Sequence, residues 1–360
     1  KNDNRILKVC LGLQNGKTPV ILVTKDIVVR VKAQMLGIQA EDFTTEQAPV
    51  SEEQYTGRCE VFVAEKKFGD FKKKHIAPEE VYQADEAGEK LPVTLMPNQF
   101  VILKADQSAR KTQLGRFDGK KIVPLSFQKK KPYGVSPRNV GQKFLQEALM
   151  ADAEEAPLVI VKGMAGTAKT FYTLAVGLHA MLEQEEPAYR RILISRPNAQ
   201  FDADIGFLPG SEQEKISPLM RPIVDNLEIL LDLEGKKKER RSEEELRGRI
   251  DYLFDTGIIT AEAMNFMRGR SITDTWLIID EAQNLTPRQV KGIITRVGKG
   301  TKVVLLGDPA QIDHPLLDTR SNGLTYASAR MRGSPLCVQL TMLPDECERS
   351  SLALDAAMRM

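Results

Sequence analysis

The sequence predicts an α/β fold in which a parallel sheet carries a phosphate-binding loop. Residues 163–170 read Gly-Met-Ala-Gly-Thr-Ala-Lys-Thr, and they stand between the β-branched run 158–161 and the apolar run 171–178. Two later apolar runs, 276–279 and 302–306, end in Asp-Glu-Ala-Gln and Gly-Asp-Pro-Ala-Gln. Polar motifs at the carboxyl ends of short apolar runs are typical of a parallel sheet that binds its ligand at one edge.

The composition limits the classes of protein to which this chain can belong. The chain has 360 residues, enough for two or three domains, and its 42% hydrophobic and 28% charged content is that of an ordinary globular protein. A net charge of +2 is too small for the chain as a whole to attract nucleic acid, so a nucleic-acid partner would have to bind at local basic stretches. Four cysteines without Cys-x-x-Cys spacing favour free thiols in a reducing compartment. No apolar run approaches the ~20 residues of a membrane span and no signal peptide is visible, so we expect a cytoplasmic protein without a membrane partner.

Residues 1–48 predict part of an α/β domain. The expected elements are a helix, a strand and a second helix over Asp3–Leu13, Pro19–Val23 and Ile27–Leu36. Asp26 follows the strand, where open α/β sheets place their sites, and the same position suits the N-cap of the next helix. The spacing leaves both roles open. Because the chain begins with Lys1 inside a predicted helix, we expect a truncated domain.

Residues 49–132 predict a small, mostly β connecting module. Short apolar stretches alternate here with polar turns, and the strand candidates are 59–63, 100–103 and 120–125. Two basic runs, Lys72-Lys73-Lys74 and Lys129-Lys130-Lys131, are either solvated loops or contacts to a phosphate backbone.

Residues 133–360 predict the nucleotide-binding domain. Ser136-Pro137 is a typical helix start, and the apolar spacing after it predicts a helix against the core. Gln142 on this helix carries a carboxamide, which can pair with the donor and the acceptor of an adenine edge. We therefore interpret Gln142 as a candidate for base recognition, with Tyr133 as the stacking partner; a surface glutamine is the alternative. The dense charges of 234–249 predict a solvated insertion.

The loop 163–170 predicts ATP and Mg²⁺ as cofactors. Backbone N–H groups at a helix N-terminus favour phosphate, Lys169 would reach the β- and γ-phosphates, and the Thr170 hydroxyl would ligate Mg²⁺. Ala168 stands where the usual pattern has glycine. Alanine is tolerated there if its dihedrals are helical and is costly if φ is positive. The candidate nucleotide contacts are Gln142, Gly163, Met164, Ala165, Gly166, Thr167, Ala168, Lys169, Thr170 and Phe171.

The two later motifs supply the remaining chemistry of ATP hydrolysis. Asp280 would hold Mg²⁺ through water, and Glu281 would orient or deprotonate the attacking water. Gln311, after the strand 302–306, would sense whether the γ-phosphate is present. Thr286-Pro287 predicts the start of the intervening helix.

These motifs resemble a known family. Residues 280–283 and 307–311 are similar to motifs II and III of superfamily 1 helicases. Together with 196–197, 206–210, 267–271, 295–298 and 348–350 they resemble the PhoH-like ATPases over 133–360. The resemblance implies a RecA-like P-loop ATPase domain, ATP hydrolysis coupled to RNA unwinding or remodelling, single-stranded RNA as partner, and homo-oligomeric rings, which we expect to be hexameric. The choice of RNA rather than DNA as the partner rests on this resemblance alone.

The first residues resemble the second half of a PIN domain, as in the two-domain PIN–PhoH proteins. The similar segments are 2–7, 23–26 and 36–42. The resemblance implies that Asp3 and Asp26 are two acidic metal ligands of a ribonuclease site. A divalent ion held by two carboxylates is weakly bound. We therefore expect no nuclease activity from this chain and RNA cleavage only in a full-length protein.

A ring would also complete the ATP site. Superfamily 1 helicases place ATP between two motor domains, and this chain has room for one, so an arginine from a neighbouring subunit would stabilise the transferring phosphoryl group. Arg349 and then Arg296 are the candidates; a surface salt bridge is the alternative for each. Two other functions stay open, an ATP-gated ribonuclease and a nucleotide-binding switch that does not hydrolyse ATP.

Overall fold

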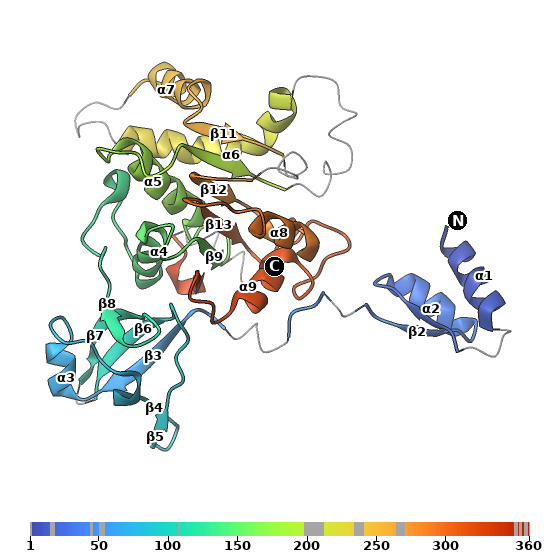
Figure 1. Ribbon diagram of the computed structural model, residues 1–360, viewed down its shortest axis with the longest axis horizontal. Coiled ribbons are helices and arrows are strands. Elements are labelled where there is room, and N and C mark those ends of the chain that lie inside the picture. The colour runs from blue at the N-terminus through green and yellow to red at the C-terminus, as the bar shows by residue number, and fades with distance from the viewer. Residues whose placement is uncertain are drawn as a thin grey trace.

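The computed structural model describes residues 2–14, 19–43, 46–49, 55–106, 108–197, 212–233, 241–263 and 271–348, together with 352, 355 and 359. Within these residues the chain forms three sheets in succession (Figure 1). None of the described helices has the length and apolar character that crossing a bilayer requires.

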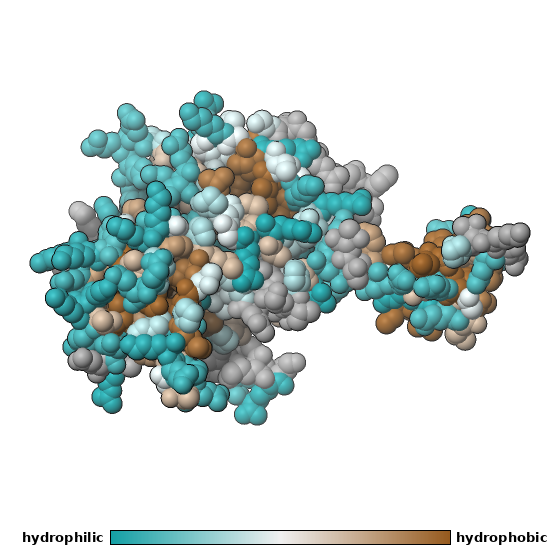
Figure 2. All heavy atoms as spheres, turned by 60° about the horizontal axis from the view of Figure 1, so that its bottom comes forward, coloured by the Kyte–Doolittle hydropathy of each residue, from teal (hydrophilic) through white to brown (hydrophobic). Residues whose placement is uncertain are grey.

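The N-terminal unit has the predicted helix–strand–helix order. Its elements are α1 (Asn2–Gln14), β1 (Ile21–Val23), α2 (Ile27–Met35) and β2 (Gln39–Glu41). β1 and β2 pair in parallel, and a small core forms between the helices and this pair from Leu7, Cys10, Val29, Ala33 and Ile38. Much apolar surface stays exposed on the unit, as the brown area at one end of the molecule shows (Figure 2).

The second sheet is mixed and forms the predicted β-rich module. Its strands are β3 (Arg58–Val63), β4 (Val81–Ala84), β5 (Lys90–Pro92), β6 (Phe100–Ala105), β7 (Ser108–Phe117) and β8 (Ile122–Pro124), in the order β5-β4-β3-β6-β7-β8. β3 and β6 are parallel and the other neighbours antiparallel. A short helix, α3 (Glu65–Asp70), packs Phe68 into the core of this sheet. The three predicted strands are confirmed.

The third sheet is wholly parallel and carries the phosphate loop. Its strands are β9 (Leu158–Lys162), β10 (Arg191–Ser195), β11 (Ile259–Ala261), β12 (Thr275–Ile279), β13 (Lys302–Gly307) and β14 (Cys337–Thr341), in the order β11-β10-β12-β13-β9-β14. β13 therefore lies between β9, which precedes the phosphate loop, and β12, which precedes Asp280. This arrangement confirms the predicted RecA-like parallel sheet.

Helices cover both faces of the parallel sheet. They are α4 (Val140–Met150), α5 (Lys169–Leu182), α6 (Glu212–Leu233), α7 (Glu243–Asp255), α8 (Pro287–Ile294) and α9 (Gly323–Met331). Successive strand residues point to opposite faces: Val159 and Val161 pack with α4, α5 and α6, while Leu158 and Ile160 pack with α8 and α9. Burial on both faces explains why these strands read as continuous apolar runs.

One local prediction in this domain is wrong. α4 does not start at Ser136-Pro137, because Asn139 is its N-cap and accepts a hydrogen bond from the backbone of Gln142 at 2.9 Å. In the charged stretch 234–249, residues 234–240 lie outside the described residues, and 242–245 and 247–249 are exposed as predicted. They are nevertheless largely helical, because α7 begins at Glu243 behind a capping box made by Ser242 and Glu245. α7 is held because its Ile250 and Leu253 are buried in the main core.

The β-rich module contacts the nucleotide-binding domain at the edge strand β14. The backbone N–H of Thr341 donates to Thr56 O at 2.8 Å. Gly57 has φ +75, and a Cβ there would lie 1.9 Å from Gln339 O, so only glycine permits this approach of the two backbones. Asn98 donates from Nδ2 to Pro335 O at 2.8 Å.

Candidate active site

The phosphate loop connects β9 to α5 and adopts a strained turn. Gly166 has φ +89, and Ala168, the N-cap of α5, has φ +61 and ψ +23. Ala168 is therefore in the left-handed region, the costly one of the two conformations considered for it. The turn places Lys169 and Thr170 at the N-terminus of α5, where the helix dipole favours an anion.

The two side chains that follow Ala168 have separate partners. Lys169 is buried, and its Nζ donates to Gly163 O at 2.6 Å and to Met164 O at 2.9 Å, so the ammonium lies inside the turn of the loop. Thr170 Oγ1 donates to Asp280 Oδ1 at 3.2 Å. The structure thus brings together the two residues predicted to ligate Mg²⁺, from motifs 110 positions apart.

Asp280 follows β12 and is buried, at 6% exposure. Burial raises the pKa of its carboxyl, and the neighbouring Glu281 charge raises this pKa further, while Arg196, Thr170 and Lys169 oppose the rise. A buried carboxylate with too little positive charge around it is suited to bind a cation, because the cation stabilises the ionised form of the carboxyl. With the Thr170 hydroxyl beside it, this oxygen donor set fits Mg²⁺.

Glu281 is held in place by two side chains. Arg196, just after β10, places Nη2 2.9 Å from Glu281 Oε1, and Gln283 donates from Nε2 to Glu281 Oε2 at 2.6 Å. Glu281 itself has φ +55, a conformation that non-glycine residues adopt at a cost. Gln283 also donates to Gln311 O at 2.8 Å and accepts from the backbone of Asp308 at 3.2 Å. Gln283 therefore links the second motif to the third.

The three motifs surround one pocket of about 220 Å³. It is lined by Ala165, Gly166, Ala168, Lys169, Thr170, Phe171, Asn226, Asp280, Glu281, Gly307, Asp308 and Gln311. Six of the nine predicted loop residues 163–171, both carboxylates and Gln311 therefore meet at one edge of the sheet, whereas Gly163, Met164 and Thr167 do not line the pocket.

Comparison with known proteins identifies the family. The PhoH-like protein family matches residues 134–358, and the PIN domain family matches residues 1–44. The chain belongs to the PhoH family. It is 40% identical to Protein PhoH2 of Bacillus subtilis, over 99% of this chain and 77% of that protein.

Two further relatives agree with this assignment. Protein PhoH2 of Mycolicibacterium smegmatis is 30% identical over 98% of this chain and 72% of its own length. A PhoH-like protein of Mycobacterium tuberculosis is 34% identical over 54% of this chain and 49% of its own length. PhoH proteins are a P-loop ATPase-like family, and the site of this PhoH chain is consistent with an ATPase of that type.

Five residues at the site were not predicted to act there: Gly307 and Asp308 of the third motif, and Arg196, Gln283 and Asn226. Arg196 belonged only to a segment of the family resemblance, and its pairing with Glu281 depends on β10 and β12 being neighbours. Gln283 belongs to the second motif, and the sequence predicted no role for it. Asn226 reaches the pocket from α6, and no local pattern marks it. The position of Arg196 directly after a buried strand is the one signal that could have identified it.

Gln142 is buried beside the phosphate loop but is not among the residues that line the pocket. Its Oε1 accepts from the backbone of Arg138 at 2.9 Å, and its Nε2 donates to Glu348 Oε1 at 2.6 Å. Glu348 in turn donates its backbone N–H to Gly166 O at 3.0 Å. Both ends of the carboxamide are therefore engaged, and base recognition by Gln142 stays a prediction.

The stacking role predicted for Tyr133 is wrong. Tyr133 is 3% exposed, in the main core. Its backbone N–H donates to Glu183 Oε2 at 3.0 Å, and Glu183 is the C-cap of α5. The 14 residues of α5 separate this end from the phosphate loop by about 20 Å. Tyr133 is aromatic because it fills the core at the far end of that helix.

Of the two candidate arginines, Arg296 is described by the structure and does not line the pocket of its own chain. Arg349 lies outside the described residues. Arg296 is exposed and donates from Nη1 to Gly292 O at 2.5 Å. Its backbone oxygen accepts from Ile272, which precedes β12, so Arg296 lies at the amino edge of the sheet, opposite the pocket. A role in a neighbouring subunit stays a prediction for both.

In the PIN-like unit, Asp26 is the N-cap of α2. Its Oδ1 accepts from the backbone of Val28 at 2.8 Å and of Val29 at 3.1 Å, which is the structural alternative considered for it. Asp3 lies in the first turn of α1. Within the part of the chain that the structure describes, no group of three or more histidine, cysteine or acidic side chains could hold a metal ion.

Proposed function

We propose that this PhoH chain is a Mg²⁺-dependent ATPase that couples ATP hydrolysis to binding and remodelling of single-stranded RNA. The observation that supports it most strongly is the 3.2 Å hydrogen bond from Thr170 Oγ1 to Asp280 Oδ1, beside Glu281 and in the pocket that Lys169 lines. A phosphate loop, a pair of metal ligands and a second carboxylate are the groups that ATP hydrolysis needs in one place.

Each side chain has a distinct part in this proposal. Thr170 and Asp280 would hold Mg²⁺, which neutralises charge on the phosphate oxygens. Lys169 would leave the loop carbonyls to contact the β- and γ-phosphates. Glu281, fixed by Arg196 and Gln283, would orient the attacking water and accept its proton.

The RNA partner rests on the resemblance to the PhoH-like ATPases, and the ring rests on that resemblance and on the lining of the pocket. Among the described residues, Lys169 is the cation that lines the pocket of one chain. An arginine from a neighbouring subunit, Arg349 or Arg296, would add the charge stabilisation that a second motor domain gives in helicases. We propose a ring of subunits on this basis; its hexameric size is the expectation that comes with the resemblance. Arg349→Ala is expected to abolish turnover and leave ATP binding intact; an equal loss of binding would contradict the trans-acting role.

Two observations favour alternative functions. The PIN-family match over 1–44 favours a full-length protein whose output is RNA cleavage gated by ATP. The left-handed Ala168 favours a nucleotide-binding switch without turnover, because strain in the loop could misplace the phosphates.

One comparison of variants separates hydrolysis from mere binding. Wild type, Lys169→Ala and Glu281→Gln would be assayed for Mg²⁺-dependent ATP binding and for phosphate release. We expect Lys169→Ala to lose both and Glu281→Gln to bind ATP without turnover. Wild-type binding with no phosphate release would establish the switch instead.

A further inference from the structure

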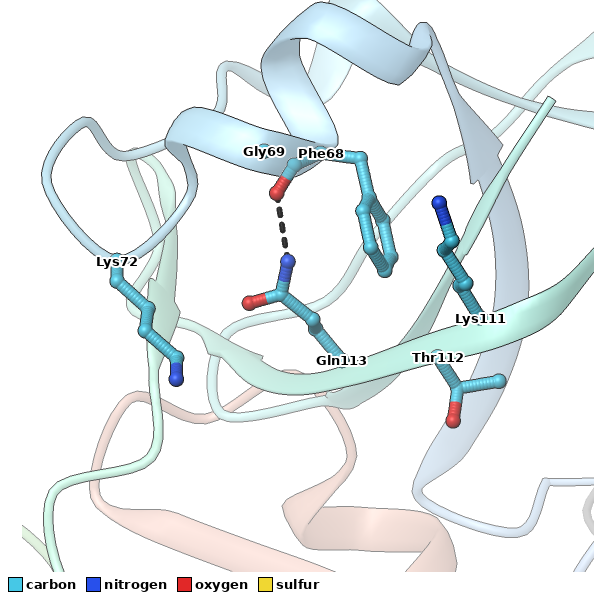
Figure 3. A pocket seen from close by; sticks show the side chains of 6 residues that line it. All are labelled: Phe68, Gly69, Lys72, Lys111, Thr112 and Gln113. Carbon is cyan, nitrogen blue, oxygen red and sulfur yellow. Dashed lines mark hydrogen bonds between the residues drawn. The ribbon is translucent and has the colours of Figure 1, made fainter. Parts of the chain in front are cut away.

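A second pocket lies in the β-rich module, on the side of the sheet that α3 covers (Figure 3). Its volume is about 450 Å³, a size that accommodates a nucleotide unit. The lining residues come from α3, from the turn after it and from β7; they are Phe68, Gly69, Lys72, Lys111, Thr112 and Gln113.

The charge around this pocket is positive. Residues 65–74 hold five lysines and two carboxylates, and Arg110 and Lys111 add to them from β7. Lys72, Lys73 and Lys74 are exposed, and their side chains form no ion pair with any residue that the structure describes. This local excess contrasts with the net charge of +2 for the whole chain.

The remaining charged neighbours are partly paired. Lys111 lies 3.2 Å from Glu65 Oε1, and 62% of its side chain is exposed. Lys67 pairs with Glu80. Lys72 is therefore the cation at the pocket that has no carboxylate to neutralise it among the described residues, and Lys111 can turn from Glu65 to an anion at small cost because exposed ion pairs are weak.

The pocket also has an oriented polar group and an apolar wall. Gln113 donates from Nε2 to Phe68 O at 2.6 Å, which fixes the carboxamide and leaves Oε1 as a hydrogen-bond acceptor at the pocket (Figure 3). Figure 3 shows the Phe68 ring between Gln113 and Lys111, with Lys72 on the other side of Gln113. Two cations therefore flank one acceptor and one ring.

We propose that this pocket binds the backbone of single-stranded RNA, with Lys72 and Lys111 contacting successive phosphates and Gln113 accepting from the nucleotide between them. The assignment rests on the proposed function for its choice of RNA. A run of exposed lysines that extends beyond one pocket matches a polymer of phosphates better than a single anion. Gln113 and Phe68 add contacts that base and sugar, but not inorganic phosphate, can use.

The test measures binding of a fluorescently labelled single-stranded RNA to the full chain, without ATP, over a series of salt concentrations. The pocket variant is Lys72→Gln/Lys111→Gln, and the control is Lys120→Gln/Lys121→Gln, which removes the same charge from exposed lysines of the same module outside the pocket. We expect roughly tenfold weaker binding for the pocket variant only. The slope of log affinity against log salt should fall in magnitude by about 1.4, for two lost phosphate contacts.

The outcomes separate this proposal from the proposed function. Restored binding in Lys72→Arg/Lys111→Arg would support a charge contact to phosphate. Equal affinities of the pocket variant and the control would overturn the pocket while leaving the RNA-coupled ATPase standing. Displacement of the RNA by a mononucleotide or by inorganic phosphate at oligonucleotide concentrations would also overturn it, in favour of a free-anion site. No RNA binding by wild type would refute both proposals.

Discussion

Arg58 and Glu346 form a buried, bidentate ion pair between the β-rich module and the nucleotide-binding domain. Nη1 lies 2.7 Å from Oε1 and Nη2 lies 3.0 Å from Oε2, and the side chains are 6% and 7% exposed. Glu346 Oε1 also accepts from the backbone of Gly141 at 2.7 Å. Two residues later, Glu348 donates its backbone N–H to Gly166 in the phosphate loop. One short segment thus contacts both the module and the loop.

Removing one partner of this pair should be costly. Arg58→Met leaves the Glu346 carboxylate buried without its cation, and we expect the free energy of unfolding to fall by about 3–5 kcal/mol. Arg58→Met/Glu346→Gln should lose less than the sum of its single variants, as measured by denaturant unfolding. Arg288→Met breaks an exposed pair with Glu46 and serves as the control, with an expected loss below about 1 kcal/mol. Strict additivity in the Arg58–Glu346 cycle would contradict the pairing.

The support of Glu281 predicts a defect in turnover rather than in binding. Arg196→Gln removes the 2.9 Å contact to Glu281 Oε1 and leaves Gln283 alone to hold the carboxylate in the position from which it would accept a proton. We expect kcat for ATP hydrolysis to fall roughly tenfold to a hundredfold with KM nearly unchanged. Arg191→Gln, at the first residue of the strand that Arg196 follows and paired with Glu262, is the control. Equal effects of the two variants would show that Arg196 acts only through the stability of β10.

The strain at Ala168 predicts a stabilising substitution. A left-handed alanine costs about 1–2 kcal/mol, and glycine removes this cost. The greater backbone entropy of glycine in the unfolded chain cancels up to about 1 kcal/mol of that gain. Ala168→Gly should therefore raise the thermal midpoint by a small amount. Ala165 in the same loop has no positive φ, so Ala165→Gly should lower the midpoint. A lower midpoint for Ala168→Gly would contradict the left-handed geometry.

A buried lysine predicts a pH dependence of stability. Burial lowers the pKa of Lys302 from 10.5 to about 7, although its Nζ donates to Ala148 O at 2.9 Å and to Ala151 O at 2.5 Å. The folded-state pKa lies below the unfolded one, so the unfolded chain binds the extra proton between these values. The free energy of unfolding should therefore rise with pH, by about 2 kcal/mol between about pH 7 and 9.

Lys302→Met tests this assignment through the slope and not through the absolute stability. The variant should show a flatter rise of unfolding free energy over the same pH range in denaturant titrations. Burial raises the pKa of the Cys59 and Cys337 thiols to about 12. Above the range of Lys302 these two thiols should therefore lower the free energy of unfolding as pH rises. A variant with the wild-type slope would show that Lys302 is charged in the folded protein at neutral pH.

The order of the motifs could be predicted from sequence because each follows a strand buried on both faces. A run such as 276–279 has to be apolar throughout, and the polar residues after it must then lie at the sheet edge. α8 was likewise predictable, since Thr286 caps it and Pro287 opens it. These are local rules, and they placed Asp280 correctly beside Thr170.

Contacts between distant segments could not be predicted in the same way. Gln142 and Glu348 are 206 positions apart, and no pattern near either residue indicates their hydrogen bond. β7 was missed because its sequence, SARKTQLGRF, is mostly polar and is held by pairing with β6 and β8. The helix α7 did carry a local signal, the Ser242–Glu245 capping box, which the density of charge around it obscured.

The central claim is that this PhoH chain hydrolyses ATP in response to single-stranded RNA. Phosphate release would be measured with and without a single-stranded RNA oligonucleotide at saturating ATP and Mg²⁺, with Glu281→Gln as the blank and a DNA oligonucleotide of the same sequence beside it. Turnover that depends on Glu281 and rises several-fold with RNA is the predicted result. Turnover that RNA leaves unchanged, or none above the blank, would contradict the account.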